Sequence, residues 1–460
     1  MALNAQHVHF IGVGGIGMSA LATILAERGV RVSGCDADAS FKGAGRLKAL
    51  GCAVHPGNDS VACSDPSIDL VVCSTAINRN SPEVVRAVAR GVRIISRAEL
   101  LAELMREKYS IAVSGSHGKT TTSALIAHIL IEAQLDPTVL VGGIMGNLGH
   151  NARSGQGSVL VAEADESDRS FTLLNPSIAV ITNIDREHLD TYRDLADVQA
   201  TFRQFVARLP NDGIAVLCAD DPGAAAILPQ IRTTFTGSII TYGRSTEVDV
   251  QLTDCQLTPS ASRISIRLQD GARVETSMPT PGEHHAYNAI AAAAVARACG
   301  VTPDLIGTAI RSFLGVDQRF SYRGLFQGAE IFDDYGHHPT EIAHMLTVAR
   351  RRTHGKLIVV FQPHRFSRTQ RLWHEFVTTF SSNSPDLLIV TDIHPASEAP
   401  IEGVTGAGLA AAVKAQYLSL DADYAEIEKT LAQTAHEGDL ILFLGAGKIN
   451  RLSEKLTAHS

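Results

Sequence analysis

Short apolar runs alternate with helical periodicities along the first hundred residues. Apolar, strand-like runs occupy residues 7–13, 31–36, 70–74 and 92–96, and a helical pattern occupies residues 16–28. Helices placed between short buried strands are typical of a parallel sheet. We therefore predict a small parallel α/β domain, followed by a polar helix over residues 98–108.

A second α/β pattern begins near Tyr109. A β-branched run at 110–114 precedes a glycine-rich turn, and apolar residues then recur at helical spacing from Leu125 to Ala133. Two more apolar runs, 159–162 and 178–182, each precede a cluster of ionisable residues. These runs predict buried strands of a second sheet.

The pattern changes to period two between residues 238 and 278. Alternation of polar and apolar residues in this stretch, clearest over 263–268, predicts antiparallel ribbons with one solvated face. An alanine-rich helix is predicted over 286–299. The next helix is predicted to begin with Thr302 as cap and Pro303 at its first position, and to stop at Gly315.

Alternating strands and helices return after residue 317. The predicted strands are 331–334, 357–362, 387–391 and 440–444. The chain has 460 residues, and domains of about 150 residues would make three of them. We therefore predict three α/β domains, at residues 1–108, 109–316 and 317–460.

Composition narrows the classes of function. The net charge is −8, which weighs against nucleic acid or an anionic membrane surface as the main partner. The seven cysteines form no Cys-x-x-Cys pair, so neither a zinc ribbon nor a disulfide framework is expected, and a reducing cytoplasm is favoured. Residues 1–13 lack the pattern of a signal peptide, and we expect no membrane span.

A first glycine loop follows the strand at 7–13 and opens a helix. Gly12, Gly14, Gly15 and Gly17 have the dinucleotide-binding spacing, and Asp36 ends the next strand. Backbone amides at such a loop bind a diphosphate, and the acid accepts a ribose hydroxyl. The ligand is left open, because UDP and NAD offer the same groups. Tight strand–helix packing is the alternative explanation of these glycines.

A second loop joins the strand at 110–114 to a helix. It contains Gly115, Gly118, Lys119 and Thr120, and is shorter than a standard Walker A loop because Val113 replaces the first glycine. Its amides can surround phosphates, Lys119 can reach the β/γ oxygens, and the Thr120 hydroxyl can bind Mg²⁺. ATP or GTP binding is predicted.

Acidic residues follow the two neighbouring strands, at 163–168 and 183–188. The carboxyl ends of parallel strands meet at one sheet edge, so these acids are expected near the phosphates. Carboxylates together with nucleotide phosphates form the usual Mg²⁺ site. Glu163 is the first candidate for a ligand, while His188 either binds a second cation or caps a helix.

Two strand ends of the third domain carry polar residues, at 333–339 and 362–368. Arg365 and Arg368 are spaced to present two guanidinium groups on one turn, a suitable seat for a carboxylate. A second substrate with a free carboxylate is implied. Surface arginines paired with nearby acids are the alternative.

Together these motifs resemble the Mur ligase family of bacterial cell-wall synthesis, in order from His9 to Gly447. The segments that carry the resemblance are 12–18, 115–122, 163–171, 182–192, 333–342 and 361–369. The resemblance implies a Rossmann-like N-terminal domain, a central P-loop ATPase-type α/β domain with antiparallel ribbons, and a C-terminal Rossmann-like α/β domain.

The pattern is most similar to the alanine-adding branch of the family. That likeness implies that ATP phosphorylates the lactyl carboxylate of UDP-N-acetylmuramate and that L-alanine attacks the acyl phosphate, releasing ADP and phosphate. The recycling ligase of the same family, which attaches a preformed peptide, remains an alternative. So do an NAD-dependent oxidoreductase, which leaves the second phosphate loop unexplained, and a nucleotide-binding switch, which leaves the paired arginines unexplained.

The resemblance also implies roles for individual residues. Lys119, Glu163, His188 and His337 would be catalytic, and Mg²⁺ would be bound by Thr120, Glu163 and His188. ATP would be bound by Gly115, Gly118, Lys119, Thr120, Thr121, Asn288, Arg319 and Asp334. The sugar nucleotide would lie on Gly14, Gly15, Gly17, Asp36 and Ser74, and the amino acid on Tyr335, His337, Arg365 and Arg368.

Some positions depart from the family pattern. His284–His285 stands where relatives often have His-Asn, and Lys448 stands where an acid is expected, so His285 and Lys448 are assigned no role. Later enzymes of the pathway use a carbamylated lysine in the central domain, but no lysine occurs between Lys119 and Lys356. This absence fits the alanine-adding branch. A homodimer is compatible with the sequence, which leaves the oligomeric state open.

Overall fold

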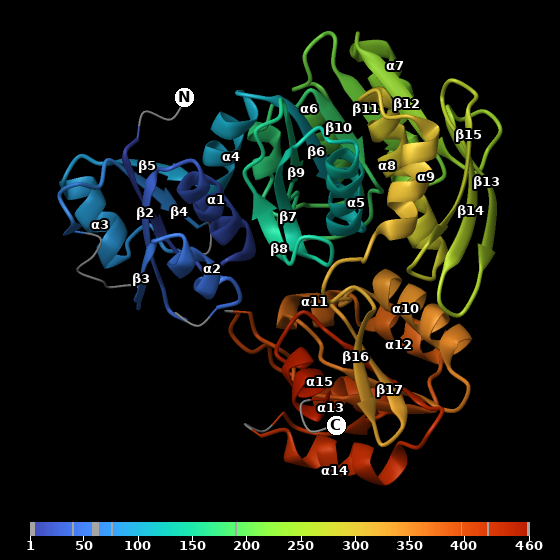
Figure 1. Ribbon diagram of the computed structural model, residues 1–460. Helices are drawn as coiled ribbons and strands as arrows, with labels where there is room; N and C mark the ends of the chain where they lie inside the picture. Colours follow the sequence, from blue (N-terminus) through green and yellow to red (C-terminus); the bar gives the residue numbers. More distant parts are fainter. Residues whose placement is uncertain are drawn as a thin grey trace. The chain divides into compact units, whose positions relative to one another are not determined.

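Three separate sheets, each with helices, make up the structure (Figure 1). The computed structural model describes residues 5–38, 41–57, 64–74, 77–188, 191–396, 398–420 and 423–457. Its contacts divide the chain into two compact units. The first comprises residues 1–255, 264–277 and 286–314, and the second comprises 256–263, 278–285 and 315–460.

The first sheet is parallel throughout, as predicted. Its order is β3-β2-β1-β4-β5, from β1 (His7–Ile11), β2 (Arg31–Asp36), β3 (Ala53–Pro56), β4 (Leu70–Cys73) and β5 (Arg93–Ser96). Its helices are α1 (Ile16–Glu27), α2 (Ala44–Ala49), α3 (Pro82–Ala89) and α4 (Arg97–Met105). Strand order reverses beside β1, so the loop after β1 lies at the point where such sheets bind ligands.

The second sheet has ten strands in the order β15-β14-β13-β12-β11-β10-β6-β9-β7-β8. They are β6 (Tyr109–Ser114), β7 (Thr138–Met145), β8 (His150–Arg153), β9 (Val159–Glu163), β10 (Ile178–Ile181), β11 (Ile214–Cys218), β12 (Ser238–Gly243), β13 (Val250–Leu257), β14 (Ser262–Arg267) and β15 (Arg273–Met278). β6 lies between β9 and β10 and pairs parallel with both.

The antiparallel prediction for residues 238–278 is wrong at its beginning. β12 pairs parallel with β11 and with β13. The helix α7 (Pro222–Thr234) explains the pairing with β11, because it carries the chain from the end of β11 back to the start of β12, and such a crossover produces a parallel neighbour.

Helices α5 (Lys119–Glu132), α6 (Leu195–Val206), α8 (Glu283–Ala298) and α9 (Pro303–Ser312) accompany this sheet, with a short 3-10 helix at Ser170–Leu173. Thr302 is the N-cap of α9 and Pro303 its first residue, as predicted. The helix ends at Ser312 rather than at Gly315. Asn147 explains the early end, because its side chain donates to the Ser312 carbonyl (2.9 Å) and accepts from Leu314 N (2.8 Å).

The third sheet has the order β16-β17-β21-β18-β19-β20. Its strands are β16 (Ser321–Phe326), β17 (Ala329–Asp334), β18 (Leu357–Phe361), β19 (Leu387–Val390), β20 (Gln416–Tyr417) and β21 (Leu440–Leu444). Only the edge pair β16–β17 is antiparallel among the pairs of this sheet. Its helices are α10 (Pro339–Arg352), α11 (Phe366–Arg371), α12 (Trp373–Ser382), α13 (Gly406–Ala412), α14 (Ala425–Thr434) and α15 (Asn450–Thr457).

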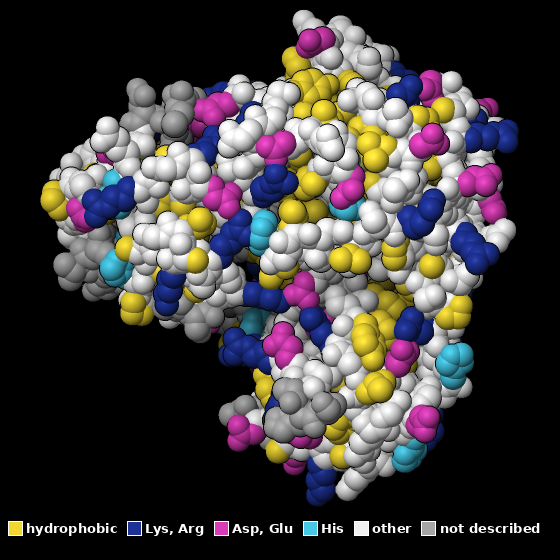
Figure 2. Space-filling model, viewed as in Figure 1, with side chains coloured by type: hydrophobic (Ala, Val, Ile, Leu, Met, Phe, Trp, Pro, Cys, Tyr) yellow, Lys and Arg dark blue, Asp and Glu magenta, His cyan; other side chains and the backbone are white. Residues whose placement is uncertain are grey.

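Charged side chains of both signs lie on the surface (Figure 2), and the described cysteines are free thiols. Basic and acidic side chains are interspersed on the face drawn in Figure 2. Six cysteines are free thiols, and Cys63 lies outside the described residues. Within the described ranges, no helix has both the length and the apolar character needed to cross a bilayer.

Candidate active site

The first glycine loop connects β1 to α1 and contacts the end of β2. Gly14 N donates to Asp36 Oδ2 (2.7 Å), and the amides of Gly12 and Val13 donate to the Cys35 carbonyl. A Cβ on Gly14 would lie 2.7 Å from the same Asp36 oxygen. The absence of a side chain at Gly14 therefore lets the loop backbone reach the carboxylate that ends β2.

The remaining predicted residues of this loop lie around the start of α1. Gly15 is the N-cap, no side chain caps the helix, and no acid occupies its first turn. Its terminal amides are therefore available to an anion. A Cβ on Gly12 would lie 3.1 Å from Ser74 Cβ, and one on Gly17 would lie 3.1 Å from Arg97 Cδ. The structure thus brings Ser74 to the loop, as the prediction requires.

The second glycine loop connects β6 to α5 and folds around the ammonium group of Lys119. Lys119 Nζ donates to the carbonyls of Gly115 (2.6 Å) and Ser116 (3.0 Å) and to Glu166 Oε1 (2.9 Å). Burial lowers the pKa of Lys119, but the charges of Glu166 and then Glu163 outweigh burial, so the pKa is raised. Lys119 is therefore a largely but not fully buried, charged group at the loop, with its side chain 14% exposed.

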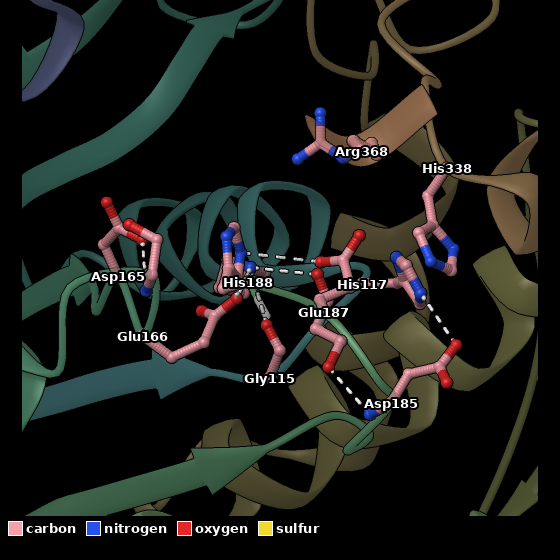
Figure 3. Close-up of polar contacts among 12 residues, drawn as sticks. Gly115, His117, Asp165, Glu166, Asp185, Glu187, His188, His338 and Arg368 are labelled. Atoms are coloured by element: carbon pink, nitrogen blue, oxygen red, sulfur yellow. Dashed lines mark hydrogen bonds and ion pairs between the residues drawn. The ribbon is translucent and has the colours of Figure 1, made fainter. Parts of the chain in front are cut away.

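The segment after β10 holds this loop in place. His117 N donates to Asn183 Oδ1 (2.8 Å), and Thr182 Oγ1 donates to the His117 carbonyl (2.6 Å). Asp185 N donates to Ser116 Oγ (2.8 Å). His117 Nε2 lies 3.4 Å from Asp185 Oδ2 (Figure 3). The loop backbone is thus fixed by the neighbouring strand end before any ligand binds.

Asn288, on α8, contacts the far end of the loop. Thr122 Oγ1 donates to Asn288 Oδ1 (3.2 Å), and a Cβ on Gly118 would lie 2.6 Å from that oxygen. Gly118 has φ +81°, which favours glycine. Thr120 and Thr121 follow, buried in the first turn of α5. The structure therefore places Asn288 and both threonines at the predicted nucleotide loop.

Glu166, Glu187 and His188 form a compact group of oxygen and nitrogen ligands. His188 Nε2 lies 3.3 Å from Glu166 Oε1 and 3.6 Å from Glu187 Oε2 (Figure 3). Ligand atoms of all three lie within 4.8 Å of one another. Burial lowers the pKa of His188, but the hydrogen bond and charge of Glu166, then the charge of Glu187, raise it overall.

The donor set of this group suits a hard divalent cation. Glu166 Oε2 is buried and has no hydrogen-bond partner among the described residues, and a buried carboxylate oxygen of this kind is a natural place for an ion. His188 was singled out by the sequence, whereas Glu166 and Glu187 were recognised only as members of the acid runs. Their positions after β9 and β10 were the signal that could have found them.

Glu163, the first candidate for a metal ligand, lies at the end of β9 beside this group. Its Oε2 accepts from Gly142 N (2.8 Å), and its charge raises the pKa of Lys119. Glu163 is not a member of the three-residue group of Glu166, Glu187 and His188. The assignment of Glu163 as a metal ligand stays a prediction.

In the second unit, Asp334 ends β17 with its carboxylate buried. Asp334 accepts from Gly336 N (2.6 Å) and Phe320 N (2.8 Å). Burial raises its pKa to about 7, and the charge of Arg319 offsets part of that effect. The Arg319 guanidinium lies over the Tyr335 ring at 5.3 Å, so Arg319, Asp334 and Tyr335 form one group.

Three imidazole rings line the ends of β17, β18 and β19. His337 packs against His364 with ring centroids 5.5 Å apart, and His364 stacks on His394 at 5.2 Å. Tyr335 meets His337 edge to face at 5.4 Å, and Arg368 Nη1 lies 3.3 Å from His364 Nδ1. The sequence predicted Tyr335, His337 and Arg368 here, but missed His364 and His394.

Burial lowers the pKa of His364 to about 2, and the electrostatic effects of His337 and then Arg368 act in the same direction. His364 is therefore neutral, with one ring nitrogen as a donor and the other as an acceptor. Arg365, next in sequence, has φ +69° and donates its backbone N–H to the His394 carbonyl (2.8 Å). The two predicted arginines thus lie on one turn, beside the imidazoles.

The two departures from the family pattern, His284–His285 and Lys448, differ in burial: His285 is buried, His284 is half-buried and Lys448 is exposed. His284 stacks on His344 with centroids 5.2 Å apart, and both ring nitrogens of the buried His285 lack partners among the described residues. Burial and the charge of Arg319 lower the pKa of His285 to about 3. Lys448 is exposed, and its charge, after burial, lowers the pKa of His394.

Comparisons with known proteins agree with this arrangement along the whole chain. Residues 7–109 match the Mur ligase family catalytic domain, 113–296 match the Mur ligase middle domain, and 318–447 match the glutamate ligase domain of Mur ligases. The chain belongs to the Mur ligase family. It is a three-domain α/β protein.

Curated relatives cover nearly the full chain. A UDP-N-acetylmuramate–L-alanine ligase of Syntrophus aciditrophicus is 42% identical over 99% of this chain and 94% of its own. The enzyme of the same name from Acidobacterium capsulatum is 44% identical over 99% and 98%.

Solved structures show the same fold. The UDP-N-acetylmuramate-alanine ligase MurC of Thermotoga maritima matches with a TM-score of 0.81 and 28% identity over 98% of both chains. A murein peptide ligase of Psychrobacter arcticus matches with a TM-score of 0.74 and 23% identity over 99% of both chains.

Proposed function

We propose that this chain is an ATP-dependent ligase that joins L-alanine to the lactyl carboxylate of UDP-N-acetylmuramate through an acyl phosphate, in peptidoglycan synthesis. Full-length relatives named for that reaction support the assignment. The structural observation that carries it is the charged Lys119, 2.9 Å from Glu166 at the phosphate loop, beside the group Glu166, Glu187 and His188. A lysine and acids at one phosphate loop are suited to phosphoryl transfer.

The sugar nucleotide would bind at the first loop. The free amides at the start of α1 would take its diphosphate, and Gly14, Gly15 and Gly17 would let the phosphates approach the backbone. The Asp36 carboxylate would release its hydrogen bond from Gly14 N and accept one from a ribose hydroxyl. Ser74 would lie at the edge of this site. The same loop would suit NAD, but an oxidoreductase would leave Lys119 and its acids without a role.

ATP would bind at the second loop. Lys119 would turn from Glu166 to the γ-phosphate, with Gly115, Gly118, Thr120 and Thr121 around the phosphates. Asn288 lies at the loop, and Arg319 and Asp334 would reach the rest of the nucleotide.

Thr120, Glu163 and His188, with Glu166 and Glu187, would hold Mg²⁺. The ion neutralises phosphate charge as it develops.

The proposed reaction has two steps, phosphorylation of the carboxylate and attack by the amine. A lactyl carboxylate oxygen forms a bond to the γ-phosphorus, the bridging bond to the β-phosphate breaks, and ADP leaves. The alanine nitrogen then bonds to the activated carbonyl carbon, the carbon–oxygen bond to phosphate breaks, and the nitrogen loses a proton. Activation is needed because a carboxylate is a poor electrophile until its oxygen becomes part of a leaving group.

The amino acid would bind at the group of Tyr335, His337, Arg365 and Arg368. Two guanidinium groups on one turn can take its carboxylate through paired charge-assisted hydrogen bonds. His337, whose Nδ1 lies 3.0 Å from the Tyr335 carbonyl, would lie beside the incoming amine. Cytoplasmic action is part of the proposal and is supported by six free thiols.

Phosphate release tests the proposal. The purified chain with ATP and Mg²⁺ should release phosphate at a rate that depends on both UDP-N-acetylmuramate and L-alanine, and chelation of divalent cations should stop it. Replacing L-alanine by the peptide L-alanyl-γ-D-glutamyl-meso-diaminopimelate tests the recycling alternative. Activity with the peptide but not with L-alanine would overturn the proposal, as would nicotinamide oxidation without ATP use.

A further inference from the structure

Glu398 joins the loop after β19 to the turn that carries Arg365. Glu398 Oε2 accepts from Ser367 N (3.0 Å), and Oε1 accepts from Ser367 Oγ (2.6 Å). The same Oε1 lies 3.7 Å from Arg365 Nη1. One carboxylate therefore contacts both the backbone of the turn and one of its two guanidinium groups.

The turn needs outside support because its backbone is strained. Arg365 has φ +69°, a conformation that a side chain with a Cβ rarely adopts. It precedes a helix of only six residues, α11, and no side chain caps that helix at Arg365. The support must therefore come from another segment of the chain.

That support comes from the loop after β19, through His394 and Glu398. Arg365 N donates to the His394 carbonyl (2.8 Å), and His394 N donates to the Pro363 carbonyl (2.8 Å). These two bonds fix the backbone ahead of Arg365, and the Glu398 bonds to Ser367 fix the backbone after it. The strained residue is thus held on both sides by one loop.

The charge of Glu398 adds a second effect. Arg365 and Arg368 are like charges on one turn, and the Glu398 carboxylate, 3.7 Å from Arg365 Nη1, offsets part of their repulsion. The acid thus helps to fix the orientation of the Arg365 guanidinium.

We propose that Glu398 is a positioning residue for the amino-acid carboxylate, acting through Arg365 and Ser367 without touching the substrate. This inference rests on the proposed function, in which Arg365 binds that carboxylate. It predicts that Glu398 affects amino-acid binding and leaves the sugar-nucleotide and ATP sites unchanged.

The test compares Glu398→Ala, Glu398→Gln and Ser367→Ala in the full chain by steady-state kinetics. Glu398→Ala should raise the KM for L-alanine about tenfold or more, with the KM values for ATP and UDP-N-acetylmuramate within about twofold of the parent. Glu398→Gln keeps an acceptor for Ser367 and should give a smaller increase, as should Ser367→Ala. Glu402→Gln, an exposed acid of the same loop, is the matched control.

A double mutant separates positioning from a general structural role. If Glu398 acts through Arg365, Glu398→Ala should change kcat/KM for L-alanine by less than about twofold when Arg365 is already alanine. Equal effects in both backgrounds would overturn the inference, as would an unchanged alanine KM in a Glu398→Ala variant with parental thermal stability. Failure of the parent to use L-alanine at all would instead refute the proposed function.

Discussion

The ammonium group of Lys119 lies 2.9 Å from Glu166 Oε1, so the lysine of the phosphate loop is paired with an acid of the neighbouring strand end. The same carboxylate oxygen lies 3.3 Å from His188 Nε2. Phosphate entering the loop would compete with Glu166 for Lys119, and a released Glu166 could then turn to a cation. The pair therefore keeps the site folded and charged while no nucleotide is bound.

Lys119→Ala should abolish ligation while leaving sugar-nucleotide binding intact. The variant removes the cation that would neutralise the γ-phosphate, and it leaves Glu166 buried without that partner. Turnover should fall by about a thousandfold or more. Calorimetry should still detect UDP-N-acetylmuramate, because its proposed site is the first glycine loop, with Gly14, and the end of β2, with Asp36. Lys356→Ala, at an exposed lysine, is the control, and loss of both ligands in a folded variant would contradict separate sites.

Gly118→Ala should weaken ATP binding more than it weakens the fold. Its φ of +81° disfavours alanine, and the new Cβ would lie 2.6 Å from Asn288 Oδ1. The matched variant is Gly271→Ala, where φ is +82° and no atom lies within 4 Å of the new Cβ. Both should lose about 1–2 kcal/mol of stability from backbone strain, whereas only Gly118→Ala should raise the KM for ATP. If the two variants had the same KM for ATP, the second glycine loop would have no part in nucleotide binding.

Arg365→Ala should chiefly raise the KM for L-alanine. A substrate carboxylate that loses a charged partner costs about 1.5–3 kcal/mol, which corresponds to about ten- to a hundredfold in kcat/KM. Arg371→Ala, at an exposed arginine on the same helix, should behave like the parent. An alanine dependence that is identical in both variants would exclude Arg365 from the amino-acid site.

Asp334 should make the unfolding free energy depend on pH. Burial raises its pKa in the folded protein to about 7, well above the ordinary value of an aspartate side chain, about 3.9. Between these values the folded state holds the proton and the unfolded state does not, so stability falls as pH rises, by about 1.4 kcal/mol per pH unit at most. Chemical denaturation at pH 5 and pH 7 should show a smaller decrease for Asp334→Asn than for the parent. An identical decrease in both proteins would contradict the assignment.

Local spacing was enough to predict both glycine loops. The positions of Gly12, Gly17 and Lys119 relative to a strand and a helix are encoded within a few residues, and the structure has the loops where the sequence places them. Among the described strands, the sequence predicted four of the five in the first sheet and four of the six in the third, because alternation of buried strands and helices persists along the chain. It did not predict β3, β16 or β20. The place of Ser74 beside the first loop was implied by the family resemblance and not by local spacing.

Other features depend on contacts that spacing does not encode. β7 was missed because Gly142 interrupts its apolar run, yet that glycine is required, since a Cβ there would lie 2.3 Å from Glu163 Oε2. Glu163 was preferred to Glu166 because the sequence shows only which acids follow β9, while the turn after the strand decides which carboxylate faces Lys119. Glu398 lies 31 residues beyond Ser367, and nothing local pairs them.

The fate of the carboxylate oxygen tests the central claim most directly. UDP-N-acetylmuramate labelled with heavy oxygen in its lactyl carboxylate is incubated with the chain, ATP, Mg²⁺ and L-alanine, and the released phosphate is analysed by mass spectrometry. If the reaction passes through an acyl phosphate, each turnover transfers one labelled oxygen from the lactyl carboxylate to the released phosphate. Unlabelled phosphate, released in step with the alanyl product, would contradict the account.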